Sequence, residues 1–391
     1  MKNITSENHR ESGIRLRNES TVTFEGRNTH KNDTQAIKDV VLNGKNESTM
    51  KGVTDQYIQT SETTENDKKN IFYSFREIRN VTKFDELQAA VQIDNAIINI
   101  NDNITLTDEL KITGKNIIVN GNNKEFDLSS DKKITINKAA AGTKISNLNI
   151  KNYVSQGIFL YKTNNITLEN INLTGDASKS LVGIDVDGST DVIIKNVIST
   201  NHKNIGIRLR DKASVELDNI TLTGVSGQNS TGIEVSDSNA KMRTIKSANH
   251  KLAMSLKKQS NVEFLGGNTH TDDKEIIKVT VATGETASTI KDDTKQYVQT
   301  SDSSQGGTEI YYGFFETREV NTVDDLIAAV QQSNRIINLN KDITLTDELQ
   351  ITGQNVIING NDKTITLAEG KKITIKATAT GSKISDLKLK G

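Results

Sequence analysis

One short line of sequence recurs through the middle of the chain and restricts the folds that it can adopt. It reads Gly157-Ile158-Phe159-Leu160, Gly183-Ile184-Asp185-Val186, Gly206-Ile207-Arg208-Leu209, Gly232-Ile233-Glu234-Val235 and Ala253-Met254-Ser255-Leu256, with starts 26, 23, 26 and 21 residues apart. Apolar and polar residues alternate in each copy, which indicates a strand with one buried face. Short strands at this period predict a solenoid, because stacked coils share a core that one coil cannot form alone. We therefore predict an all-β fold, a parallel β-helix.

Asparagine recurs with the same period, one place before an apolar residue, at Asn147, Asn170, Asn196 and Asn219. Asparagine tolerates the left-handed backbone of a tight corner, and stacked asparagine amides can bond from coil to coil. We expect a structural ladder, with a row of ligand-binding amides as the alternative.

A longer repeat overlies the short one. Residues 104–121 recur as 343–360 with 14 of 18 positions identical, an offset of 239, and Asn28-Thr29-His30 recurs as Asn268-Thr269-His270, an offset of 240. We expect a window on a tandem array that begins inside one unit and ends inside another. The expected segments are a last coil (1–30), a cap or connector (31–80), a complete β-helix unit (81–270), a second connector (271–319) and the start of the next unit (320–391).

Two helices are expected near 82–92 and 322–331. Thr82 with Asp85, and Thr322 with Asp325, resemble capping boxes in which Asp replaces the usual Glu. Their expected role is to cover the open first coil of a unit, whose backbone and apolar residues would otherwise be exposed. Binding of a partner is the alternative role.

Composition excludes several classes of function. The chain has no Cys and no Pro, and a net charge of −1 gives no reason to expect a nucleic-acid partner. No apolar run is long enough for a membrane span, and residues 1–7 are too polar for a secretory signal. The five histidines lack metal-ligand spacing, and His30 and His270, equivalent positions of the repeat, are expected in turns. We expect no metal and no cofactor.

Three stretches in order, Val81–Val91, Ile98–Leu110 and Ile112–Gly121, resemble the start of pectate-lyase-like adhesive domains, and the order recurs over Val320–Gly360. The resemblance implies a right-handed β-helix on a bacterial cell surface or cell wall. It also implies a non-catalytic segment of an adhesin, which binds glycans or extracellular proteins or serves as a stalk beside neighbouring repeats. The alternative is a polysaccharide lyase or glycoside hydrolase of the β-helix type. The Arg-x-Pro-x-x-Arg stretch of pectate lyases cannot occur in a chain without Pro.

One outward column of the coils is chemically notable. It contains Phe159, Tyr161, Asp185, Asp187, Arg208, Arg210 and Glu234. We expect Asp185, Arg208 and Glu234 to form an exposed ladder of alternating charges that fixes the register of the coils. Two alternatives stay open: a glycan- or protein-binding patch with the two aromatic residues at its edge, and Asp185 with Glu234 as a catalytic carboxylate pair. Arg208 between those carboxylates would lower both pKa values, which opposes general acid catalysis.

Overall fold

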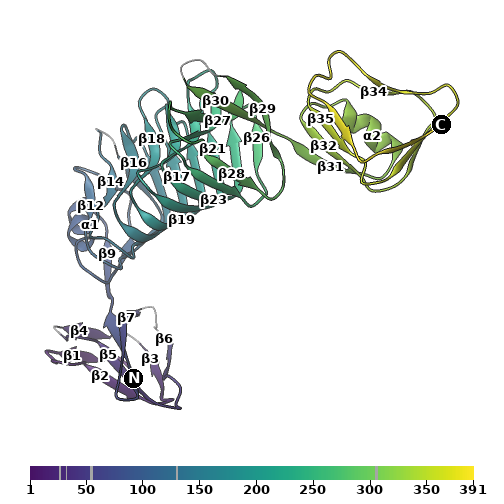
Figure 1. Ribbon diagram of the computed structural model, residues 1–391. Coiled ribbons are helices and arrows are strands. Elements are labelled where there is room, and N and C mark those ends of the chain that lie inside the picture. The colour runs from purple at the N-terminus through teal and green to yellow at the C-terminus, as the bar shows by residue number, and fades with distance from the viewer. Residues whose placement is uncertain (26–27, 32, 53–55, 129–130, 304–306) are drawn as a thin grey trace. The chain divides into compact units, whose positions relative to one another are not determined.

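The chain folds into stacked coils of short strands. The computed structural model describes residues 1–391 apart from 26–27, 32, 53–55, 129–130 and 304–306, some of which fall in the expected connectors. The described residues gather in two compact units, Met1–Leu222 and Thr223–Gly391. Parallel pairing between successive coils dominates both units, and the described part of the chain contains two short helices (Figure 1). The predicted all-β parallel solenoid is confirmed.

Unit 1 contains β1 to β20, all of β21 except its last residue, and one helix. Their bounds are β1 (Thr5–Glu7), β2 (Ile14–Arg17), β3 (Thr21–Phe24), β4 (Thr29–Lys31), β5 (Ile37–Leu42), β6 (Thr49–Gly52), β7 (Tyr57–Glu65), β8 (Lys68–Phe75), β9 (Glu77–Val81), α1 (Phe84–Ala90), β10 (Ala96–Ile100), β11 (Ile104–Thr105), β12 (Leu110–Ile112), β13 (Ile118–Asp127), β14 (Ile134–Ile136), β15 (Lys144–Lys151), β16 (Gln156–Tyr161), β17 (Asn164–Thr174), β18 (Val182–Asp187), β19 (Thr190–Thr200), β20 (Ile205–Arg210) and β21 (Ser214–Thr223). Two sheets run along the coils, one in the order β12-β14-β16-β18-β20 and the other from β9 through β10, β13, β15, β17 and β19 to β21.

Unit 2 continues with the same kinds of element. Their bounds are β22 (Thr231–Ser236), β23 (Asn239–Ala248), β24 (Leu252–Lys257), β25 (Asn261–Phe264), β26 (Thr269–Thr271), β27 (Glu275–Val281), β28 (Thr289–Asp292), β29 (Tyr297–Ser303), β30 (Thr308–Phe314), β31 (Glu316–Val320), α2 (Val323–Val330), β32 (Arg335–Leu339), β33 (Ile343–Leu345), β34 (Leu349–Ile351), β35 (Val356–Asn359), β36 (Thr364–Leu367), β37 (Ile373–Ile375), β38 (Lys383–Ser385) and β39 (Lys388–Lys390). Its paired orders include β22-β24-β27-β30-β29 and β31-β32-β35-β38.

The core of unit 1 consists of apolar columns that run from coil to coil. Ile158 pairs with Ile184 and Ile184 with Ile207, while Val186 of the same strand pairs with Leu209. All five side chains are fully buried. The glycine at each coil start is also enclosed, since a Cβ on Gly183 would meet the carbonyl oxygen of the next coil at 2.6 Å.

The asparagine column forms a hydrogen-bonded ladder at the bends of β15, β17, β19 and β21. Asn170 donates to Asn147 at 2.8 Å, Asn196 to Asn170 at 3.0 Å, and Asn219 to Asn196 at 2.8 Å. All four have φ between 52° and 56°, the left-handed region that asparagine tolerates.

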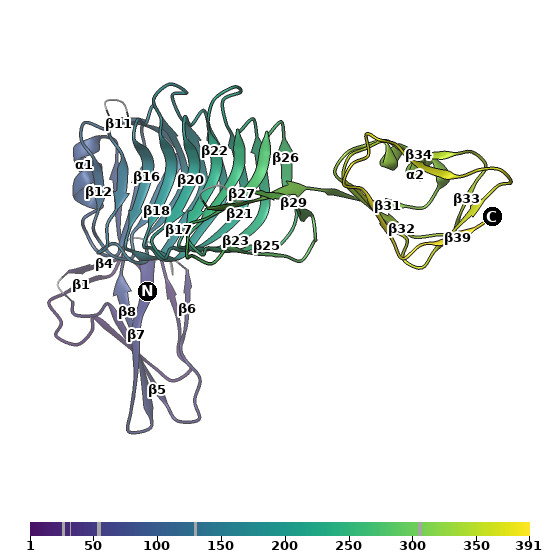
Figure 2. The same cartoon turned by 45° about the horizontal axis from the view of Figure 1, so that its top comes forward.

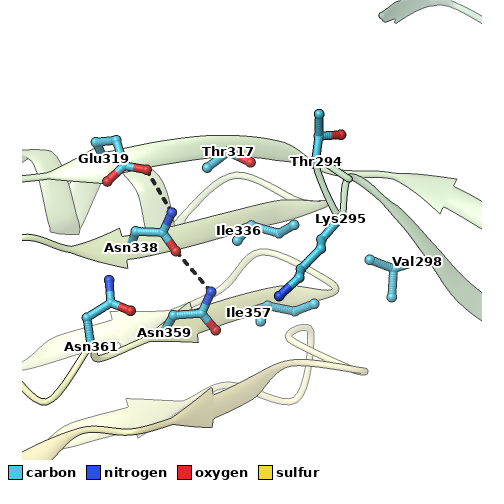
Figure 3. A pocket seen from close by; sticks show the side chains of 10 residues that line it. All are labelled: Thr294, Lys295, Val298, Thr317, Glu319, Ile336, Asn338, Ile357, Asn359 and Asn361. Atoms are coloured by element: carbon cyan, nitrogen blue, oxygen red, sulfur yellow. Dashed lines mark hydrogen bonds between the residues drawn. The ribbon is translucent and has the colours of Figure 1, made fainter. Parts of the chain in front are cut away.

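Unit 2 contains a shorter row of the same kind. Asn338 donates to Glu319 at 2.7 Å and Asn359 donates to Asn338 at 2.9 Å, from β32 and β35 (Figure 3). The amides in these rows bond to one another, which limits what they can offer a ligand.

Both helices lie at the start of a coil stack, as expected, but they are capped differently. Phe84, Leu87 and Ala90 of α1 are buried, and the helix packs against β9, β10 and β12. Figure 1 shows α1 close to β12 and β9. The expected partner Asp85 is replaced by Glu86, which accepts from the Thr82 N–H at 3.0 Å and from its hydroxyl at 3.2 Å. In α2, the Thr322 hydroxyl accepts from the Asp325 N–H at 3.2 Å and donates to the Asp325 carboxylate at 2.7 Å.

In each unit an antiparallel hairpin and an aromatic cluster close one run of coils, and a further run follows in the sequence. Strands β29 and β30 pair with β27 in unit 2, and β7 and β8 pair with β5 in unit 1. In unit 2 the rings of Phe264, His270 and Phe314 each lie within 5.8 Å of the Tyr297 ring, centroid to centroid. The expectation of turn histidines is wrong, because His30 and His270 lie in β4 and β26 with 2% and 3% of the side chain exposed.

Candidate functional site

The outer face of β16, β18 and β20 brings six of the seven predicted column residues together. Figure 2 shows these three strands side by side along the coil stack. Period-two alternation turns isoleucine and leucine inward and leaves two polar or aromatic positions per strand outside. The outer positions align in two rows, Phe159–Asp185–Arg208 and Tyr161–Asp187–Arg210. Glu234, the seventh residue, lies on β22 of unit 2 and pairs with Lys257 at 2.7 Å.

Asp185 is the buried centre of this face. Arg208 donates to its carboxylate from Nε at 3.0 Å and from Nη2 at 2.6 Å, and Arg210 donates from Nε at 3.2 Å. The Gln156 amide donates as well. The side chain of Asp185 is 0% exposed, so the expectation of an exposed charge ladder is wrong at this position. Two long arginine side chains cover the short carboxylate.

The electrostatics of Asp185 follow from this enclosure. Burial alone would raise the pKa of its carboxyl, because the charged form loses its hydration. Hydrogen bonds and positive charge from Arg208 and Arg210 outweigh burial, so the pKa of Asp185 is lowered. A carboxylate that is buried and ionised has no proton to give and no open path to a substrate. The pairing of Asp185 with Glu234 as catalytic carboxylates is therefore not supported.

Asp187 has the opposite electrostatic character. Its side chain is 9% exposed and lies 2.7 Å from Arg210 Nη1. Burial raises the pKa of its carboxyl, the charge of Arg210 opposes that rise, and the nearby carboxylates of Asp211 and Asp185 add to it. The net shift is upward. Asp187 therefore keeps its proton to higher pH than an ordinary aspartate does, whereas Asp185 loses its proton at lower pH.

A third carboxylate on this face was missed in the sequence. Asp211 follows β20 directly, has φ 58°, and its Oδ2 lies 3.2 Å from the same Nη1 of Arg210 that contacts Asp187. Its side chain is 59% exposed. Asp211 falls in the turn, where period-two alternation no longer indicates the direction of a side chain. The pair Arg210-Asp211 at a strand end was the available signal.

Two aromatic rings and four cations complete the face. The Phe159 and Tyr161 rings lie 5.8 Å apart, and Tyr161 is 38% exposed. Lys133 Nζ lies 5.1 Å and Arg210 Cζ 6.0 Å from the centre of the Phe159 ring, which orders that ring by cation–π attraction. Lys162 Nζ lies 5.3 Å from the centre of the Tyr161 ring. An exposed aromatic edge beside hydrogen-bonding charged groups suits a sugar, which has both apolar C–H faces and hydroxyls.

The hollow in Figure 3 fits catalysis less well than this face. Among the described residues, no group of three or more His, Asp or Glu side chains is placed to hold a metal ion. The hollow in Figure 3 is lined by Thr294, Lys295, Val298, Thr317, Glu319, Ile336, Asn338, Ile357, Asn359 and Asn361. Its one carboxylate, Glu319, already accepts a hydrogen bond from Asn338.

No protein-family model and no curated protein matches the chain. Solved structures with a similar fold include an alginate lyase from Paenibacillus sp. str. FPU-7 (11% identity, TM-score 0.39, 80% of this chain and 99% of that one). They also include the catalytic domain of a GH87 α-1,3-glucanase in complex with nigerose (11%, 0.31, 82% and 73%). A third is the tailspike of E. coli bacteriophage HK620 in complex with a pentasaccharide (8%, 0.32, 81% and 72%). At these identities, the likeness concerns the fold, which is that of the parallel β-helix proteins.

These comparisons correct two expectations. The sequence led us to expect a non-catalytic segment of a surface adhesin, and no enzyme. The similar structures named above are a lyase, a glucanase catalytic domain and a tailspike bound to a sugar, and they agree with the enzymatic alternative instead. The resemblance to the pectate-lyase-like domains stands for the β-helix fold and not for adhesion.

Proposed function

We propose that the chain is a carbohydrate-active protein that cleaves a polysaccharide on the outer face of β16, β18 and β20. The observation that carries this proposal is Asp187, a largely buried carboxyl with a raised pKa beside the exposed ring of Tyr161. A general acid must hold a proton near the working pH and reach the oxygen that it protonates. Asp187 meets the first condition better than Asp185, whose pKa is lowered, and its place at the end of β18 brings it to the rim of the face.

Hydrolysis suits this face better than β-elimination. A lyase acting on a uronate needs free cations to neutralise the sugar carboxylate. Both guanidinium groups here are paired with Asp185, and Arg210 contacts Asp187 and Asp211 in addition. The other two cations of the face, Lys133 and Lys162, lie over the Phe159 and Tyr161 rings. Glycoside hydrolysis needs a protonated carboxyl and a second carboxylate. We therefore propose a glycoside hydrolase, which would meet its polymeric substrate outside the cell.

Two assays on the purified chain test this proposal. Alginate, polygalacturonate, xylan and an α-1,3-glucan serve as substrates, with release of reducing ends and absorbance of unsaturated uronides as readouts. We expect new reducing ends without unsaturated product. Asp187→Asn should lower the rate by about 100-fold or more, whereas Glu216→Gln, exposed on β21 in the other sheet, should match the wild type. Unsaturated product would indicate a lyase, and no cleavage of any polysaccharide would overturn the proposal.

A further inference from the structure

One nitrogen atom of Arg210 contacts two carboxylates, one nearly buried and one exposed. This atom, Nη1, lies 2.7 Å from Asp187 Oδ2 and 3.2 Å from Asp211 Oδ2. Those two oxygens can therefore be no further apart than the sum of the two distances. Glycosidases that retain the configuration of the sugar place their two carboxyl groups about 5–5.5 Å apart, whereas inverting enzymes need about 6.5–9.5 Å to admit a water molecule. This upper limit lies below the separation that an inverting pair needs, so the shared nitrogen excludes the inverting class and is compatible with the retaining one.

The surroundings of the two carboxylates differ, as they must if one carboxyl acts as the acid and the other as the nucleophile. Asp187 is 9% exposed at the end of β18, and Asp211 is 59% exposed in the turn after β20. Two carboxyl groups in unlike environments can take the roles of acid and nucleophile. Tyr161 pairs in register with Asp187, so an exposed aromatic ring lies on the same rim. The face therefore combines an acid, an open carboxylate and a surface for a sugar ring.

We infer that Asp187 and Asp211 act as a pair in hydrolysis with retention of configuration, an inference that rests on the proposed function. In the first step Asp187 gives its proton to the glycosidic oxygen. The bond from that oxygen to the anomeric carbon breaks while an Asp211 oxygen bonds to the carbon, forming a glycosyl ester. In the second step water attacks the anomeric carbon, the ester bond breaks, and a proton of the water returns to Asp187. Arg210 holds both carboxylates in place.

The backbone conformation at Asp211 allows two substitutions, to asparagine and to glycine, that add no backbone strain. Its φ of 58° lies in the region that asparagine and glycine adopt without the strain that alanine would suffer. Asp211→Asn keeps the shape and removes the charge, and Asp211→Gly removes the side chain and leaves room for a small anion. Melting curves should overlay those of the wild type, because Asp211 is exposed.

The experiment measures cleavage of the best substrate from the panel by the wild type, Asp187→Asn, Asp211→Asn and Asp211→Gly. We expect both asparagine variants to lose about 100-fold or more in rate. We expect sodium azide to restore turnover in Asp211→Gly, with a glycosyl azide as product, and wild-type product to keep its anomeric configuration by NMR. Full activity in Asp211→Asn, or an inverted product, overturns the pair and leaves the proposed function intact. A wild type that cleaves none of the polysaccharides overturns both.

Discussion

At the scale of single residues, the charge of Asp185 stabilises the fold. It accepts from two arginines and from Gln156 while fully buried. Asp185→Asn removes the charge and half of the acceptor capacity, and the arginines, about 30% exposed, recover part of the loss by binding water. We expect a loss of about 1.5–3 kcal/mol in the free energy of unfolding at pH 7, measured with urea. Glu216→Gln should change it by less than about 0.5 kcal/mol.

The same variant has a defined dependence on pH. The pKa of Asp185 is lower in the folded chain than in the unfolded chain, where it takes its ordinary value near 3.8. Its contribution is therefore fully present above that value and is lost as the pH falls further, towards the folded pKa. The difference between wild type and Asp185→Asn should be constant from pH 7 to pH 5 and should shrink below about pH 4. A difference that grows on acidification would contradict the assigned charge.

Leu209 tests the apolar column beneath the site. It is fully buried on β20 and pairs with Val186 of the preceding coil. Leu209→Ala should leave a cavity between stacked coils and lower the free energy of unfolding by about 2–5 kcal/mol. Ile193→Ala is the control, because that side chain is 39% exposed on β19 and should lose far less. Denaturant melts that show less than about 0.5 kcal/mol for Leu209→Ala would mean that the register is wrong.

Individual residues show which side-chain positions could be predicted from the sequence and which could not. Alternation placed Ile184 inside and Arg208 outside, because a strand has only two faces and the repeat aligns the coils. It could not foresee that Asp185, on the outer face, is buried. That outcome depends on how the long side chains of Arg208 and Arg210 lie across the next strand, which is set by charge and not by period. Asp211 escaped prediction because alternation ends where the turn begins.

At the scale of elements, the bends of the long strands depend on residues that accept positive φ. Thr244 occupies such a bend in β23, one coil period after Asn219, with φ 53°. A β-branched residue is strained there by about 1–2 kcal/mol relative to asparagine or glycine. We expect Thr244→Asn to raise the free energy of unfolding by about 1 kcal/mol, measured with urea. Thr244→Ala keeps most of the strain and is the matched control, and a Thr244→Asn variant less stable than wild type would contradict the argument.

The two helices share a sequence pattern at their N-termini but are capped by different side-chain pairs. Sequence spacing indicated a box of Thr with Asp in both, and α2 follows it, but in α1 the longer Glu86 reaches Thr82 instead. The choice depends on side-chain length, which spacing alone does not resolve. Thr322→Ala removes the cap of α2 and should cost about 0.5–2 kcal/mol. Thr82→Ala keeps the bond from its own N–H to Glu86, so we expect a smaller loss in the same urea melts.

At the scale of the whole molecule, the long sequence repeat reappears as a repeated cluster. In unit 1, Asp33 lies 3.0 Å from His30 and 2.8 Å from His9, and in unit 2, Asp273 lies 3.2 Å from His270 and 3.1 Å from His250. A tyrosine hydroxyl completes each cluster. The Tyr57 hydroxyl lies 3.3 Å from His30 Nε2, and the Tyr297 hydroxyl lies 3.0 Å from His270 Nε2. The repeat thus preserves a polar network as well as apolar spacing. We propose that residues 81–270 form one complete β-helix unit, that 271–319 form a connector, and that 320–391 form the start of an equivalent unit, as the sequence repeat predicts.

His30 of the first cluster should make the stability of the molecule depend on pH. Burial lowers the pKa of His30 below its ordinary value of 6.5, against the opposing hydrogen bond and charge of Asp33. The unfolded chain therefore binds more protons in the window just below pH 6.5, so stability falls as the pH falls through it. Unfolding by urea at pH 7.5, 6.5 and 5.5 should show this decline in the wild type. His30→Gln, which cannot titrate, should show a shallower decline, and identical slopes in the two proteins would refute the assignment.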